Sequence, residues 1–147
     1  MTTKELQESI VSNMQRWQKI ENAAVASTGR VLERADNPVV RLVMEVIQRD
    51  SMVHHRVQGM IAASLSAPDQ AVSLTPEELA EVWGLVEEHI ALERKTVDLA
   101  KEALAAVKGK HMVVQEYLLN YLLIDEEKHN ALLDHLEGVK RGMYPYG

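Results

Sequence analysis

One stretch near the C-terminal end places acidic groups and an imidazole inside a leucine-rich pattern. The stretch YLLIDEEKHNALLDHLE contains Asp125, Glu126 and His129. Steps of three and four residues from Leu122 reach Glu126 and His129 before they return to Leu133, so both polar groups lie on the apolar face of a helix. Because an unpaired buried charge is costly, these two side chains need each other or a cation.

Three other segments carry polar groups in the middle of an apolar stripe with a period near 3.6. These positions are Glu21 in the first segment, Ser51, His54 and Gln58 in the second, and His89 and Glu93 in the third. Carboxylates and imidazoles at such positions are candidate metal ligands. The chain has no cysteine, so any metal must be held by nitrogen and oxygen atoms.

Three breaks separate the elements that must position these groups. Asn37-Pro38 is an N-cap followed by proline, Thr75-Pro76-Glu77-Glu78 is a capping box, and Lys108-Gly109-Lys110 is a helix stop. We therefore predict a single all-α domain over residues 1–147, built as a four-helix bundle. The helices are expected at about 3–34, 38–65, 76–107 and 110–141, with a loop at 66–74 and a non-helical tail at 142–147.

Apolar residues on each stripe are expected to form the bundle core. They include Leu6, Trp17 and Val31 in the first helix, Val40, Ile47 and Ile61 in the second, Leu79, Val86 and Ala100 in the third, and Leu133 and Leu136 in the fourth.

The polar positions are matched in height and repeated along the chain. Glu21 and His54 lie 16 and 17 residues from Asn37, and Glu93 and Glu126 lie equally far from the glycine of the third break. In antiparallel hairpins each pair therefore meets at one level. A shift of 75 residues aligns IQRDSMVH with LLIDEEKH, which indicates two duplicated antiparallel helical hairpins.

Composition narrows the function classes. The chain has 46% hydrophobic and 26% charged residues and a formal net charge of −6. No apolar run approaches the ~18 residues of a membrane span, and no signal peptide is recognisable. We expect a cytoplasmic protein with no membrane association. Without a basic stripe, nucleic acid is not an expected partner.

The arrangement resembles the ferritin-like di-metal carboxylate proteins, and its spacing is most similar to rubrerythrin and ferritin-like domains. The resemblance covers residues 3–141 and rests on a Glu in KIENAAV, a DxxxH in RDSMVHH, a Glu in IALERKT and a DExxH in IDEEKH. It implies a di-iron centre, with manganese or zinc as the other candidate ions. The implied metal ligands are Glu21, His54, Glu93, Glu126 and His129. Asp50 and Asp125 would each accept the other ring N–H of a ligand histidine.

Two positions depart from the family pattern. Ser51 stands where the repeat has Glu126, and a serine hydroxyl is a poor ligand beside a carboxylate. His89 is an additional candidate, but it would have to reach ~6 Å along the helix axis to replace that ligand. Thr96 stands where rubrerythrin carries an additional Glu, which argues against a rubrerythrin-type peroxidase.

Two classes of function fit this pattern. The first is a di-iron or di-manganese carboxylate oxidoreductase that acts on oxygen, peroxide or ferrous iron. The alternative is a degenerate, non-catalytic bundle with one metal or none that serves as a structural or binding module. Without a metal, Glu126 and His129 would form a buried hydrogen-bonded pair. Metal ions, a small oxidant and a second copy of the chain, forming a homodimer, are the expected partners.

The connection between the second and third helices is short for a ferritin-like crossover. Its nine residues, 66–74, reach only ~30 Å, whereas a crossover needs ~42 Å. Either Thr75–Trp83 forms a separate short helix or hairpins are exchanged between two chains. We expect the separate helix.

Overall fold

The computed structural model describes residues 1–67 and 75–143, which form four α-helices and no strand. The all-α class is therefore confirmed for this part of the chain. The helices are α1 (Thr3–Arg34), α2 (Pro38–Ser66), α3 (Pro76–Val107) and α4 (Val113–Met143). Most of the predicted loop and the last four residues of the predicted tail lie outside the described residues. None of the described helices is both long and apolar enough to cross a membrane.

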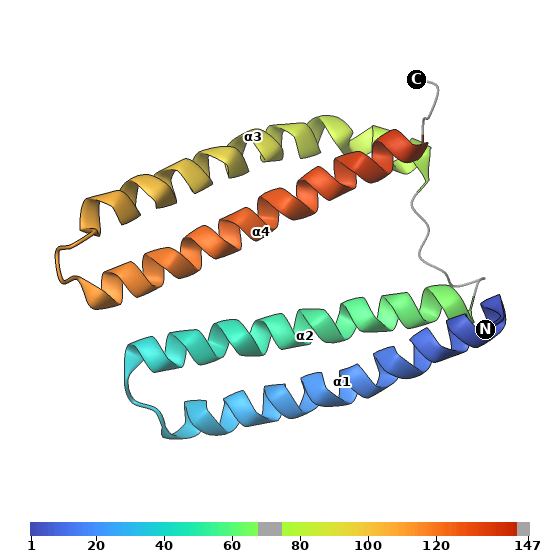
Figure 1. Cartoon of the computed structure of the whole chain (residues 1–147), viewed down its shortest axis with the longest axis horizontal. Coiled ribbons are helices and arrows are strands. Elements are labelled where there is room, and N and C mark those ends of the chain that lie inside the picture. Colours follow the sequence, from blue (N-terminus) through green and yellow to red (C-terminus); the bar gives the residue numbers. More distant parts are fainter. Residues whose placement is uncertain (68–74, 144–147) are drawn as a thin grey trace. The chain divides into compact units, whose positions relative to one another are not determined.

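The chain divides into two units, one holding α1 and α2 and the other holding α3 and α4. Within each unit the two helices lie side by side along their length (Figure 1). A connection of only a few residues joins the two helices of each unit, so they run antiparallel. Each hairpin can therefore be described by itself.

Side chains cap the start of three helices, and two of these caps, Asn37 and Thr75, were predicted from the sequence. Thr2 and Glu5 form a capping box at α1, and the Asn37 Oδ1 accepts hydrogen bonds from the Val39 and Val40 amides at α2. At α3 the Thr75 hydroxyl accepts from the Glu78 amide at 3.3 Å and donates to the Glu78 carboxylate at 2.8 Å. The Thr75–Glu78 box thus closes through the hydroxyl, not through the Thr75 backbone N–H.

Three predicted boundaries are wrong. Thr75–Trp83 is not a separate helix, because α3 continues without a break through Gly84 to Val107. A glycine in a helix interior costs about 1 kcal/mol relative to alanine, which is too little to end a helix that packs along its length. The last helix begins three residues later than expected because Gly109 and His111 both have positive φ, and it continues past residue 141 to Met143.

Replacing Gly84 with alanine is expected to raise the free energy of unfolding by about 0.5–1 kcal/mol. Nothing lies within 4 Å of a Cβ added at this position, so the gain comes from the helical backbone alone. Gly109 is the matched control, since its added Cβ also meets nothing but its φ is +72°. Gly109→Ala should lower the free energy of unfolding by about 1–2 kcal/mol. Urea unfolding followed by circular dichroism measures both, and equal effects at the two positions would contradict the assignment of Gly84 to a helix interior.

The seam between α1 and α2 is polar. The buried residues of this hairpin are Glu21, Thr28, Ser51 and Gln58. Two further glutamine side chains cross the seam, from Gln18 to the His55 carbonyl at 3.0 Å and from Gln48 to the Val25 carbonyl at 3.1 Å. Amide side chains that bond to the facing helix backbone fix the register of the hairpin, because a shift by one turn would leave them unpaired.

The seam between α3 and α4 is apolar near the start of α3 and polar further along. Leu79, Trp83 and Ile90 form a buried cluster. Val86, Leu133 and Leu136 pack against this cluster. Beyond it, around Glu93 and Glu126, the contacts between the two helices are polar.

Many predicted core residues stay exposed when each hairpin is taken by itself. Leu6, Trp17 and Ile47 keep between 43% and 50% of their surface in the α1–α2 hairpin. Two packed helices bury only a narrow strip, whereas the apolar stripes predicted here are wider than that strip. Each hairpin therefore retains an apolar face that its own two helices do not cover.

Candidate metal centre

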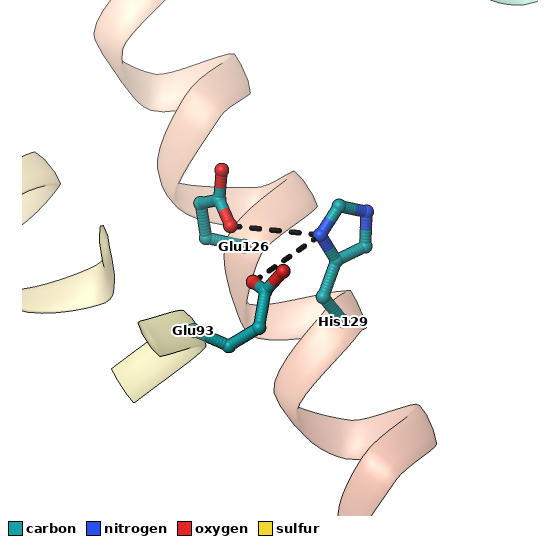
Figure 2. A group of neighbouring side chains, drawn as sticks. All are labelled: Glu93, Glu126 and His129. Carbon is teal, nitrogen blue, oxygen red and sulfur yellow. Dashed lines mark ion pairs between the residues drawn. The ribbon is translucent and has the colours of Figure 1, made fainter. Parts of the chain in front are cut away.

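Three of the predicted ligands come together between α3 and α4. Glu93 is on α3, and Glu126 and His129 lie one turn apart on α4 (Figure 2). The His129 Nδ1 is 3.4 Å from the Glu93 Oε2 and 3.5 Å from the Glu126 Oε2. Glu93 and Glu126 therefore meet at one level of this hairpin, as their spacing predicted.

The spacing of these atoms suits a single bound ion. One ligand atom from each of the three residues lies within 4.8 Å of the others. Ligand atoms about 2.1 Å from an ion are about 3.0 Å apart along an octahedral edge and about 3.4 Å apart along a tetrahedral one. The two distances from His129 are close to the tetrahedral value, so small side-chain movements would bring these atoms to bonding distance from an ion.

Glu93 has an oxygen that the protein leaves without a hydrogen bond. Its side chain is only 12% exposed, and its Oε2 is buried and unpartnered apart from the 3.4 Å approach of His129. The other oxygen, Oε1, lies 3.0 Å from the Nε2 of His89. The additional candidate His89 thus contacts Glu93 but stands outside the three-residue cluster. A buried carboxylate oxygen without a donor is a position that a cation would satisfy.

The surroundings of Glu93 lower the pKa of its carboxyl group. A hydrogen bond from Glu126 is the main cause that lowers the pKa of Glu93, burial works against it, and His129 and His89 lower it further. The pKa of Glu93 lies below its ordinary value as a result. A metal ion bound here would also favour the charged form of the Glu93 carboxylate.

Further contacts hold the His129 and Glu126 side chains in place. The His129 Nε2 lies 3.4 Å from the Asp125 Oδ2, so the ring turns its other nitrogen toward the two glutamates. Asp125 is also held by Lys128 at 2.7 Å. The Thr96 hydroxyl lies 2.8 Å from the Glu126 Oε2 and 2.6 Å from the Glu93 carbonyl oxygen. Asp125 thus lies beside His129, the histidine with which the family resemblance pairs it.

Replacing Thr96 with valine is expected to weaken metal binding by about tenfold, because partners that orient a ligand typically contribute 10- to 100-fold. Valine keeps the shape of the side chain but loses the contact with Glu126. Thr28→Val is a matched control, since the Thr28 hydroxyl bonds only to carbonyls of its own helix, at 2.8 and 3.0 Å. Calorimetric titration with Zn²⁺ compares the two variants. Equal affinities would show that Thr96 does not orient Glu126.

The predicted ligands of the first hairpin also meet, but in a different setting. The Glu21 Oε1 is 3.3 Å from the Nδ1 of His54 and accepts a hydrogen bond from the Gln58 Nε2 at 3.2 Å. Burial works to raise the pKa of Glu21, but hydrogen bonds from Gln58 and Ser51 and the nearby His54 outweigh it, so this pKa lies below its ordinary value. The protein itself therefore stabilises the charged carboxylate.

The roles of two residues, Gln58 and Thr96, were not predicted from the sequence. Gln58 was predicted to lie on the polar stripe but without a partner, and Thr96 was interpreted only as the loss of a glutamate. Both lie one turn from a predicted ligand, so the spacing was visible, but the contact each makes depends on the facing helix. Asp50 makes no hydrogen bond or ion pair with His54 in the described part of the chain, unlike Asp125 with His129.

Comparisons with protein-family models, with curated proteins and with solved structures find no match to this chain.

Proposed function

We propose that this protein binds a divalent transition metal ion through Glu93, Glu126 and His129, in the manner of the ferritin-like carboxylate proteins. One observation carries the proposal: two helices bring two carboxylates and an imidazole within 4.8 Å, and one of the carboxylate oxygens is buried without a hydrogen bond. A metal ion supplies the positive charge that this group of side chains lacks.

The donor set favours particular ions. Two carboxylates and one imidazole suit iron, manganese and zinc, and three protein ligands leave coordination positions open for a small molecule. Iron is the first candidate. A bound iron ion would supply one-electron chemistry toward oxygen, peroxide or ferrous iron, and an oxidoreductase of this kind is the activity we propose. The chain's own contribution is to orient His129 through Asp125 and Glu126 through Thr96.

The arrangement of the two hairpins is also part of this proposal. We infer a ferritin-like four-helix bundle built from two duplicated hairpins, formed within one chain or with a second copy. The support is the apolar face that each hairpin leaves exposed when taken alone. Sedimentation of the metal-free and metal-loaded protein distinguishes a monomer from the homodimer predicted from the sequence.

A second candidate function is a metal-free structural or binding module. It is favoured by the neighbours that lower the pKa of Glu93, with Glu126 first among them, since they stabilise the charged carboxylate without an ion. In the first candidate function the buried Oε2 of Glu93 binds a metal ion, and in the second it does not.

Metal uptake by the purified full chain tests the proposed function. The metal-free protein is incubated with Fe²⁺ without oxygen, or with Mn²⁺ or Zn²⁺, and freed of unbound ions before elemental analysis. We expect stoichiometric uptake and a higher melting temperature in the presence of the ion, because a ligand that binds only the folded state stabilises it. No uptake of any of the three ions would leave the metal-free module as the function.

A further inference from the structure

The central glutamates of the two hairpins, Glu93 and Glu21, have different neighbours. In the α3–α4 hairpin the Glu93 carboxylate faces a second carboxylate, Glu126, and one of its oxygens is buried without a hydrogen bond. In the α1–α2 hairpin the Glu21 carboxylate faces side chains that donate hydrogen bonds, and its Oε1 accepts one from the Nε2 of Gln58. The same residue type at the same level of a hairpin thus meets different chemistry.

Gln58 makes the main contact that distinguishes the surroundings of Glu21 from those of Glu93. It is only 3% exposed, and its Nε2 donates to the Glu21 Oε1 at 3.2 Å. The carboxylate fixes the orientation of this amide, because a turned amide would set its own oxygen against a carboxylate oxygen. Ser51 and His54 lie against the same carboxylate. Side-chain donors therefore occupy directions that metal bonds would need.

Charge leads to the same conclusion. The α3–α4 cluster contains two carboxylates, whereas the α1–α2 cluster contains one, because Ser51 is a neutral group. Three side chains that can donate hydrogen bonds surround the Glu21 carboxylate and stabilise its charge without an added cation, although the Oε1 of Gln58 is buried without a hydrogen bond. A site with one carboxylate also offers a divalent ion less negative charge than a site with two.

We propose that the α1–α2 hairpin is a hydrogen-bonded counterpart of the metal site, in which Gln58 and Ser51 take the place of the ion, so that each chain binds one metal ion and not two. This inference rests on the proposed function, since it assumes that the α3–α4 cluster binds metal. It assigns Glu21 and His54 to a structural contact, and it makes the centre mononuclear in each chain.

Two isosteric variants of the full chain test this assignment. Glu93→Gln and Glu21→Gln each remove one charge from the central glutamate of a hairpin and keep its shape. Zn²⁺ titration by calorimetry, with elemental analysis at saturation, gives the affinity and the number of ions per chain. We expect one ion per chain in the parent protein. Glu93→Gln should weaken binding by more than about 100-fold, beyond the effect of losing an orienting partner, whereas Glu21→Gln should change it by less than about threefold.

The outcomes separate this inference from the proposed function. Two ions per chain in the parent, falling to one in Glu21→Gln, would overturn the inference and leave the proposed function standing, because Gln58 would then have turned its free oxygen toward an ion. No binding in the parent protein would overturn the proposed function and the inference with it. One ion per chain that is lost in Glu21→Gln and kept in Glu93→Gln would place the site in the other hairpin and also overturn the inference. Melting temperatures of the metal-free variants show whether each one is folded before it is titrated.

Discussion

Replacing Glu126 and His129 together with alanine is expected to abolish metal binding while the helices persist. The double variant removes two of the three ligands and leaves Glu93 as the only one. It also removes two neighbours that lower the pKa of Glu93, so the metal-free protein should be less stable than the parent, because the mostly buried Glu93 carboxylate loses groups that stabilise its charge. Metal content after loading and far-ultraviolet circular dichroism measure the two effects.

Glu127→Ala with His135→Ala is the matched control for this experiment. Both residues lie on α4 and are exposed, and neither belongs to the cluster. The control removes the same two side-chain types from the same helix, and we expect it to bind metal like the parent. Unchanged binding by the Glu126→Ala, His129→Ala variant would contradict the site assignment.

Replacing Ser51 with glutamate is expected to create a second metal site. Ser51 is 6% exposed and lies against the Glu21 carboxylate, so a glutamate here would face Glu21 as Glu126 faces Glu93. Metal uptake should rise toward two ions per chain. Without metal the variant should unfold more easily, by a few kcal/mol, because a second carboxylate is buried beside the first. Elemental analysis and thermal melting with and without metal follow both effects.

Two further variants make this gain of function interpretable. Ser64→Glu adds the same charge at an exposed position of the same helix, and it should change neither metal content nor stability much. Ser51→Glu with Gln58→Leu also removes the amide that bonds to Glu21 and places leucine where the repeat has Leu133, so its second ion should bind more tightly. A Ser51→Glu variant with one ion and the stability of the parent would contradict the placement of residue 51.

The sequence by itself determined the helices and the level at which the polar groups meet. Proline, capping residues and glycine mark the ends of the elements, because their backbone preferences act locally. Spacings of 3.6 residues per turn place Glu93, Glu126 and His129 on facing stripes, since a regular helix converts residue number into height and direction. Where the local signal was weak the prediction failed, as at Gly84, which lies inside α3 and does not end a helix.

Only the tertiary structure decided what each polar group contacts. The spacing predicted Glu21 and Glu93 as equivalent ligands, yet Gln58 satisfies one of them and Glu126 faces the other. Thr96 likewise contacts Glu126, which is 30 residues away in the sequence. The physical reason is that helix periodicity sets only the face on which a side chain lies. Its partner depends on the rotamer and on the residue across the seam, and these determine whether a buried carboxylate needs a metal ion.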